Sequence, residues 1–304
     1  MLDKIVKDLG DKIINSLENS NLDNIYTELS NIKSPALLCG IGGSHVVSIF
    51  LEKVLVIKNN IIAKNIDVEE YFLTNFSNYN NLVLLSHSGN NHGIKSLLAT
   101  NKNKYLFTTR KSKVTNEITL NYSIENRIKS FVSFEDTIIP LSIILGYYLN
   151  FSHFPVEIFS QEETFDILDF NNVNIIYDET SKTCAIFLET SMIEAGISSV
   201  TMHTKYSFCH GRSNLVSNKE SLVIYLMTRE SELDKMLTTE IKKISNNVLI
   251  LKELTKDSVI ADYLLTIKAL RFLNYLNKTY HKEFVNVKYN KIVSTTYHFK
   301  GDLV

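Results

Sequence analysis

The sequence is poor in the two residues that interrupt regular structure. It holds ten glycines and three prolines in 304 residues, where average usage predicts roughly 21 and roughly 15. A chain of this composition has little material for long irregular loops, which excludes collagen-like and linker-rich proteins. We expect regular helices and strands joined by short turns, and the length suits one large or two medium domains.

Cysteine is also scarce, and long apolar runs are missing. Cys39, Cys184 and Cys209 lie far apart and are odd in number, so we predict neither a disulfide framework nor a paired Cys-x-x-Cys zinc site. No run of eighteen apolar residues occurs, and the N-terminus mixes acidic and basic residues. We therefore expect a cytoplasmic protein with no signal peptide and no membrane partner.

A charge surplus is missing as well. The 32 basic and 33 acidic residues give a formal net charge of −1, and only five of the basic residues are arginines. A binder of the nucleic-acid backbone normally carries a basic surplus, so we expect no nucleic acid as main partner. His87 and His92 lie five residues apart across a glycine turn, which is not the close spacing of a zinc site. We predict no metal and no cofactor.

What the sequence does contain is an alternation of short apolar runs with segments of helical period. Such alternation favours an α/β fold with a mainly parallel sheet and right-handed crossovers. Pro140 would kink the last predicted helix of the first half unless it lay in the first turn. In that half the predicted strands are 35–40, 61–66, 81–86 and 104–109, and the predicted helices are 3–18, 22–30, 44–56, 67–76, 91–100 and 133–150.

The same alternation begins again after the segment at 151–160, which is the best candidate for a domain boundary. We therefore expect two domains of one layout, residues 1–155 and 156–304, with an arm over 283–304 that packs back on the body. In the second half the predicted strands are 173–178, 198–203, 221–228 and 247–253, and the predicted helices are 182–196, 230–245 and 258–276.

Five of the ten glycines fall in two loops, CGIGGSH over 39–45 and LSHSGNNHG over 85–93. Each loop follows an apolar strand and opens a helix, where glycine lets backbone N–H groups approach an anion. Neither loop is a Walker motif or a full dinucleotide pattern, and glycine and serine also serve as ordinary helix caps. Two such loops at successive carboxyl ends of a parallel sheet favour a ligand site.

These two loops together resemble the sugar isomerase (SIS) family, whose best-known member is the isomerase half of glucosamine-6-phosphate synthase. The resemblance implies two tandem three-layer domains and a bound phosphosugar, with residues 33–230 covered. The family more often has Gln at the place of His87 and Thr at the place of Asn91. By this resemblance the phosphate is bound by Gly42, Gly43, Ser44, Ser86, His87, Ser88 and Asn91.

Two more stretches resemble the family. Glu125 and Ser130 match a glutamate followed five residues later by a serine, although Val132 stands near the place of the usual lysine. Cys209–Arg212 resembles the His-Gly-Pro motif with Arg212 at the proline position, which is closer to a His-Gly-Arg subset. The second half has DETSK instead of a glycine loop, so we predict one phosphate site per chain.

The resemblance also implies a chemistry. Aldose–ketose isomerisation requires that the sugar ring opens and that a proton moves between C1 and C2. We predict that His210 opens the ring and that Glu194 transfers the proton. Glu189 lies five residues earlier on the same helix, about 140° away, and is the rival base. Arg212 could steady an oxyanion or bind a second acidic substituent of the substrate. Because the synthase takes the matching histidine from its partner subunit, the resemblance implies a homodimer.

Other interpretations stay open at this stage. Glu194 could be a solvated helix residue, His210 a cap and Arg212 a surface ion-pair residue. The function predicted is a phosphosugar isomerase or a related enzyme of an amino-sugar phosphate, with deamination or deglycation as variants. The alternatives are a non-catalytic phosphosugar sensor and a purely structural α/β protein.

Overall fold

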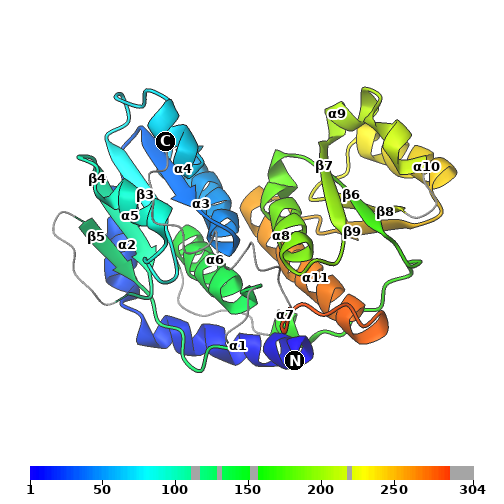
Figure 1. The fold of residues 1–304 in the computed structure, drawn as a ribbon, viewed down its shortest axis with the longest axis horizontal. Helices are drawn as coiled ribbons and strands as arrows, with labels where there is room; N and C mark the ends of the chain where they lie inside the picture. Colours follow the sequence, from blue (N-terminus) through cyan, green and yellow to red (C-terminus); the bar gives the residue numbers. More distant parts are fainter. Residues whose placement is uncertain (111–116, 129–131, 151–156, 218–220, 288–304) are drawn as a thin grey trace. The chain divides into compact units, whose positions relative to one another are not determined.

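The chain forms two compact units, each with its own parallel sheet and helices (Figure 1). One unit consists of Leu9–Lys129 and Ser133–Pro155, and the other of Met1–Asp8 and Val156–Val287. The predicted α/β class with mainly parallel sheets is confirmed. The computed structural model describes residues 1–110, 117–128, 132–150, 157–217 and 221–287.

The first unit contains a five-stranded sheet of order β2-β1-β3-β4-β5 in which all pairs are parallel. The chain passes from β1 outward to β2 and then back across to β3, so the direction of winding reverses between β1 and β3. The sequence did not predict β5, and the strand expected at 61–66 is shorter than predicted. The strands are β1 (Ala36–Gly40), β2 (Ala63–Asn65), β3 (Asn81–Leu85), β4 (Asn103–Thr108) and β5 (Glu117–Asn121).

Helices cover both faces of this sheet. On one face α3 packs against β1, β3 and α6. On the other face Leu37, Leu82 and Leu106 form an apolar cluster with Val68 of α4 and Ile94 of α5. The helices of this unit are α1 (Leu2–Asn19, whose first turns belong to the other unit), α2 (Leu22–Asn31), α3 (Gly43–Asn59), α4 (Val68–Leu73), α5 (His92–Leu98) and α6 (Phe134–Leu149).

Pro140 lies in the second turn of α6 and is buried, not in the first turn, where a proline is best tolerated. Its missing N–H leaves the backbone C=O of Asp136, four residues earlier, without its usual helical hydrogen bond. The start of α6 is thus held by side-chain contacts, which matter for the site described below.

The second unit contains a four-stranded sheet of order β7-β6-β8-β9, again parallel throughout. Its winding reverses between β6 and β8, as the first sheet reverses between β1 and β3. All four strands were predicted from the sequence. They are β6 (Asn172–Tyr177), β7 (Ser199–Thr204), β8 (Ser221–Met227) and β9 (Val248–Lys252).

Helices α8 and α11 pack together on one face of the second sheet. On the other face Ile176, Val223 and Tyr225 pack with Phe208 and Leu237. The short elements after β7 were not predicted. The helices are α7 (Glu157–Ser160), a 3-10 turn (Glu179–Ser181), α8 (Lys182–Glu194), α9 (Lys205–Cys209), a second 3-10 segment (Arg212–Ser217), α10 (Glu232–Ile244) and α11 (Ser258–Thr279).

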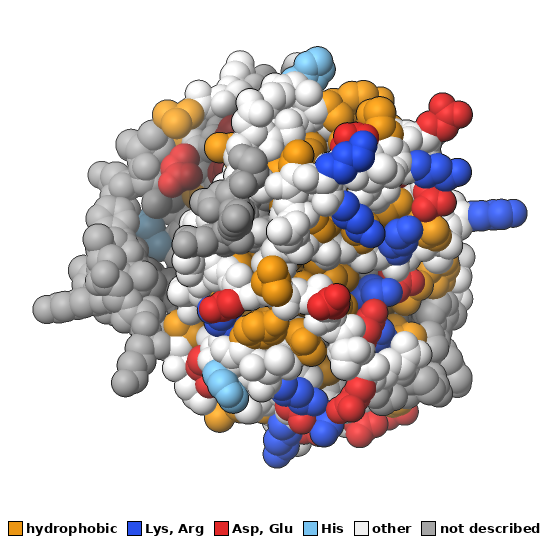
Figure 2. Space-filling view, turned by 90° about the vertical axis from the view of Figure 1, so that its right-hand side faces the viewer, with side chains coloured by type: hydrophobic (Ala, Val, Ile, Leu, Met, Phe, Trp, Pro, Cys, Tyr) orange, Lys and Arg blue, Asp and Glu red, His pale blue; other side chains and the backbone are white. Residues whose placement is uncertain are grey.

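Charged side chains of both signs are interspersed over the described part of the face in Figure 2, and neither sign gathers into a single patch there. Among the described helices, none combines the length and the apolar character that crossing a membrane requires. The predicted C-terminal arm lies, from residue 288 on, outside the described residues, as does most of the predicted boundary segment.

Candidate functional site

The first glycine loop makes a tight turn between β1 and α3. A Cβ added at Gly40 would lie 2.2 Å from the backbone oxygen of Ser44, and Gly42 has a φ of +58°. Neither position accepts an ordinary side chain without strain. The amide of His45 donates to the carbonyl of Gly42 at 2.8 Å and closes the turn. The loop therefore brings the bare backbone at the start of α3 to the edge of the sheet.

The second loop, Ser86–Asn91, joins β3 to α5 and is stabilised by its own side chains. Ser86 is buried and its Oγ accepts from the amide of Gly89 at 3.1 Å. Ser88 is exposed, and its Oγ accepts from the amide of Asn90 at 3.2 Å. The Oδ1 atom of Asn91 accepts from the amides at the start of α5 and caps that helix. Asn91 therefore has only its NH₂ group left for a ligand.

The two loops meet at one edge of the sheet. Gly40, the last residue of β1, is in register with Leu85, the last residue of β3. Because these strands are adjacent and parallel, their loops leave the sheet side by side at the point where the winding reverses. Open α/β sheets bind ligands at this kind of point. Of the residues predicted for phosphate, the structure brings the glycines and Ser44 of the first loop together with the second loop.

The start of α6 adjoins the same edge. A Cβ on Gly43 would lie 2.4 Å from the Oγ1 atom of Thr137, which donates to the carbonyl of Ser133 at 3.0 Å. The first turns of α3 and α6 are therefore in contact through a glycine. Two helix starts at one sheet edge add two positive dipole ends to the site.

His87 is anchored by its backbone and aims its ring at α6. Its carbonyl accepts from the hydroxyls of Thr108 at 2.8 Å and Thr109 at 2.9 Å, which ties the loop to the end of β4. Its Nδ1 atom lies 3.3 Å from Oδ1 of Asp136. Burial lowers the pKa of His87, the charge of Asp136 opposes this effect and Arg127 adds to it.

Sequence reasoning missed Asp136 and Arg127. The buried carboxylate of Asp136 pairs with the guanidinium of Arg127 and accepts from Ser133 Oγ at 2.5 Å. Two signals could have found them: an acidic pair inside a predicted apolar helix, and one of only five arginines two residues after Glu125. Glu125 itself is exposed, and Ser130 lies outside the described residues.

The predicted base lies in the other unit. Glu194 is the last residue of α8 and is half-buried. Burial, and then the charge of Glu189, raise the pKa of Glu194 to about 7. Glu189 is also half-buried, and its carboxylate accepts from the hydroxyl of Thr190 at 3.2 Å. A carboxylate whose pKa lies near neutrality can both take up and release a proton at physiological pH.

The predicted histidine lies at the other end of a strand from this base. His210 and Arg212 are exposed, with Gly211 between them at a φ of +95°. Helix α8 runs back from the carboxyl end of β6 to the amino end of β7, whereas His210 follows the carboxyl end of β7. The six residues of β7 span about 17 Å. Within one chain the structure does not bring Glu194 and His210 together.

The carboxyl edge of the second sheet has a different chemistry from that of the first. The Nζ atom of Lys205 lies 2.7 Å from a carboxylate oxygen of Asp178 and 2.7 Å from one of Asp234. Tyr225 donates its hydroxyl to Asp234 at 2.5 Å, and Lys205 and Asp234 are buried. Glycines and serines are replaced here by two carboxylates that share the buried ammonium group of Lys205, and the exposed Arg229 lies 3.7 Å from Asp178. Two cations and two carboxylates leave this cluster without a surplus of positive charge to offer a phosphate.

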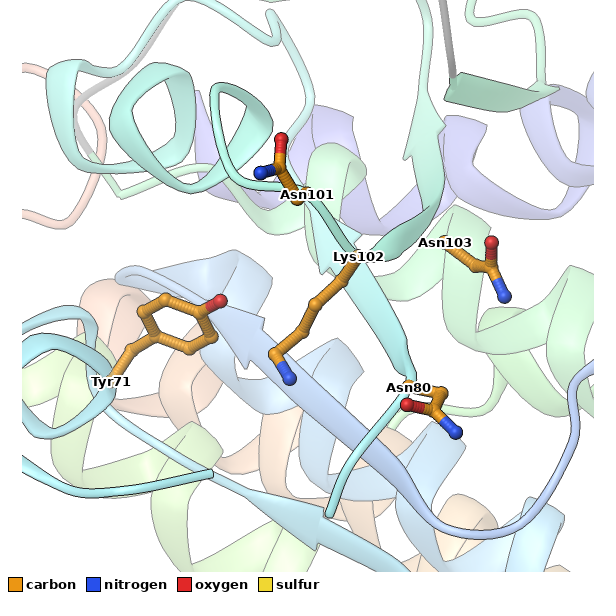
Figure 3. A pocket seen from close by; sticks show the side chains of 5 residues that line it. All are labelled: Tyr71, Asn80, Asn101, Lys102 and Asn103. Atoms are coloured by element: carbon orange, nitrogen blue, oxygen red, sulfur yellow. The ribbon is translucent and has the colours of Figure 1, made fainter. Parts of the chain in front are cut away.

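A cavity of about 460 Å³ lies far from the glycine loops, at the amino ends of β3 and β4 (Figure 3). It is polar, and the amine of Lys102 at its centre already donates to the carbonyls of Phe76, at 2.8 Å, and Tyr79. In the part of the chain that the structure describes, no group of His, Cys, Asp and Glu side chains could hold a metal ion. The lining residues are Tyr71, Asn80, Asn101, Lys102 and Asn103.

Comparison with solved structures identifies the fold. Tagatose-6-phosphate ketose/aldose isomerase from Escherichia coli superposes on this chain with a TM-score of 0.73 at 12% sequence identity. The match covers 95% of this chain and 96% of the isomerase. Glucosamine-6-phosphate deaminase from Thermotoga maritima gives a TM-score of 0.69 at 15% identity, covering 91% of this chain and 95% of that one. The sequence matches no family model and no curated protein.

A third structure has the same arrangement. The C-terminal domain of glucosamine-fructose-6-phosphate aminotransferase from Francisella tularensis gives a TM-score of 0.66 at 13% identity, over 93% of this chain and 97% of that domain. Two parallel sheets flanked by helices, in the arrangement of these proteins, define the SIS fold. The predicted fold class is therefore confirmed.

Proposed function

We propose that the protein binds a phosphosugar at the carboxyl edge of its five-stranded sheet. One observation carries the proposal: two glycine loops leave β1 and β3 side by side where the sheet reverses its winding. The bare backbone at Gly42 and Gly43, with the hydroxyls of Ser44 and Ser88, offers the kind of donors that a phosphate group accepts from. Three structures of this fold, compared above, are named for hexose 6-phosphates or their amino derivatives.

The reaction that fits best is an aldose–ketose isomerisation. Glu194, with its pKa raised to about 7 by burial and Glu189, is a suitable base for carrying a proton between C1 and C2. In this proposal His210 takes the proton of the C1 hydroxyl and returns a proton to the ring oxygen as the bond between C1 and that oxygen breaks. Arg212 stabilises the enediolate oxygen. The step is a proton transfer within the sugar, so it requires no oxidant and no added cofactor.

The proposal requires a homodimer, because Glu194 and His210 lie at opposite ends of β7 in one chain. The two would act on the same sugar only if they came from different copies. Mixing two inactive variants, Glu194→Gln and His210→Ala, should then restore activity, to about a quarter of the wild-type value for random symmetric dimers. No recovery on mixing would overturn the arrangement across two chains.

Solvent exchange at C2 tests the chemistry. The protein is incubated in deuterated water with a panel of hexose and hexosamine 6-phosphates, and loss of the C2 proton is followed by NMR. Glu194→Gln should abolish exchange while binding is kept, and Ser88→Ala should weaken binding of every ligand. Glu189→Gln is the matched control, since Glu189 lies about 7.5 Å nearer the carboxyl edge of the sheet. If Glu189→Gln alone abolishes exchange, the base is Glu189.

A related reaction has support of its own. The similarity to glucosamine-6-phosphate deaminase makes deamination of an amino-sugar phosphate the second candidate. The same C2 proton transfer would then leave an imine at C2, which water hydrolyses to a ketone and ammonia. Release of ammonia from glucosamine 6-phosphate distinguishes this reaction from isomerisation. Tight binding without any exchange at C2 would instead identify a sensor.

A further inference from the structure

The contact between His87 and α6 points to a property of the site that the resemblance does not supply. The Nδ1 atom of His87 and the Oδ1 atom of Asp136 lie 3.3 Å apart, at ion-pair distance, and neither has a hydrogen-bond partner among the described residues. A buried polar atom without a partner is costly. A proton on Nδ1 would lie next to the charge of Asp136, and Nε2 would then be left to meet a ligand.

The other oxygen of Asp136 is fully occupied. Oδ2 accepts from Ser133 Oγ at 2.5 Å and pairs with Arg127, which itself donates to Ser133 at 3.0 Å. These contacts hold the carboxylate in one orientation. Its side chain is 8% exposed, against 20% for the histidine ring. Asp136 is thus a fixed anion behind a partly accessible imidazole.

Two further charged side chains on the described part of these elements are paired. Glu135, next to Asp136 on α6, pairs with Lys12 and accepts from the amide of Ile128. Arg110, which packs over Gly89 on the same loop, pairs with Glu117. The buried Tyr122 has its pKa raised by burial and by Asp136, so it stays neutral. Only Asp136 and Arg127 act on the ring with opposite signs.

We propose that His87 takes up one proton at Nε2 when the phosphosugar binds, that Asp136 positions the ring for this uptake and that Arg127 limits it in the free protein. The inference rests on the proposed function, since the phosphate supplies the negative charge. The proton comes from solvent: Nε2–H then donates to the phosphate, while the charged ring forms an ion pair with Asp136.

This uptake makes affinity depend on pH. In the free protein burial lowers the pKa of His87, so the ring is neutral at pH 7. In the complex a phosphate beside Nε2 raises that pKa. Between the two values, binding consumes a proton and weakens as the pH rises, by up to about tenfold per pH unit. A glutamine at this position, which is more frequent in the resembling family, has no proton to gain.

The experiment must separate the protein's titration from that of the ligand, because a phosphate ester itself titrates near pH 6. Calorimetry is therefore done with the hexose 6-phosphate that binds in the exchange panel and with the matching 6-sulfate, whose charge is constant. Buffers with different heats of ionisation give the number of protons taken up. We expect the wild type to take up between half a proton and one proton per sulfate ester at pH 7, with an affinity loss of about tenfold from pH 6.5 to 8.

Three variants test the roles. His87→Gln should bind with no proton uptake and a flat pH profile. Asp136→Asn should shift the pH dependence of the affinity to lower pH, because Arg127 then acts on the ring unopposed. In the His87→Gln background the same change should have no such effect. Arg127→Gln should shift the profile the other way, and it serves as the test if Asp136→Asn does not fold.

The outcomes distinguish the two proposals. If neither ester binds, the proposed function fails and this inference fails with it. If the esters bind but His87→Gln takes up as many protons as the wild type, only the inference is overturned. If Asp136→Asn and Arg127→Gln shift the profile in the same direction, or not at all, Asp136 does not position His87.

Discussion

At the scale of single residues, the site depends on glycines at positions where a side chain would collide with a neighbouring atom. Gly43 is the clearest case, because its missing Cβ makes room for the hydroxyl of Thr137 at the start of α6. The contact joins residues 43 and 137, which lie 94 positions apart in the sequence. No local pattern could have predicted it, although the glycine itself is conspicuous in a chain that has only ten.

The contact at Gly43 gives a rescue experiment. Gly43→Ala should lower the free energy of unfolding by about 1–3 kcal/mol, since the added methyl overlaps a packed atom. In a Thr137→Ala background the same change should cost less than about 0.5 kcal/mol, because the Cβ of residue 137 lies at an ordinary 3.8 Å. Chemical denaturation of the four proteins measures this, and equal losses in both backgrounds would refute the contact.

Glu194 gives a prediction for stability against pH. Its pKa is raised from the ordinary 4.5 to about 7 by burial and Glu189, so the folded chain binds more protons than the unfolded chain between these values. Stability should therefore fall as the pH rises from about 4.5 to about 7. Glu194→Gln removes this loss and should gain up to about 3 kcal/mol over the wild type at pH 8, and nothing at pH 4. A gain that is the same at both pH values would contradict the raised pKa.

At the scale of elements, continuous apolar runs were the reliable signal. Strands β1, β3 and β8 are buried along their whole length, and such strands appear in a sequence as unbroken hydrophobic runs. Strand β5 was missed because it is the edge strand of its sheet and has mixed burial. The positions of the two glycine loops were predicted by glycine and serine at strand ends. The pairing of His87 with Asp136 was not, because it joins two elements across a tertiary contact.

The ion cluster at the edge of the second sheet gives a prediction at the same scale. Lys205→Met should lower the free energy of unfolding by about 3–5 kcal/mol, because the buried Asp234 loses its ammonium partner and Asp178 keeps only the exposed Arg229. Binding of the hexose 6-phosphate should not change. The control is Lys243→Met, whose exposed pair with Glu240 should cost less than about 0.5 kcal/mol. If the two variants lost similar amounts of free energy of unfolding, the buried cluster would contribute no more to stability than an exposed ion pair does.

At the scale of the whole molecule, one layout is built twice with different chemistry at its two sheet edges. The five-stranded sheet ends in glycine and serine loops with two helix starts beside them. The four-stranded sheet ends in Asp178, Lys205 and Asp234, which satisfy one another. The repetition of the layout could be predicted, because the same alternation of strands and helices occurs in both halves of the sequence. The chemistry of the second edge could not, because Lys205 and Asp234 reach it from different elements.

Amide hydrogen exchange measured with and without the bound hexose 6-phosphate tests the central claim most directly. The edge of the five-stranded sheet gives the signal, and the edge of the four-stranded sheet is the internal control in the same sample. We predict slower exchange in residues 40–46 and 86–94 when the ligand is present, and no change in residues 178–184. Protection at 178–184, or no protection at either glycine loop under conditions in which the ligand binds, would contradict a phosphosugar site at the β1 and β3 ends.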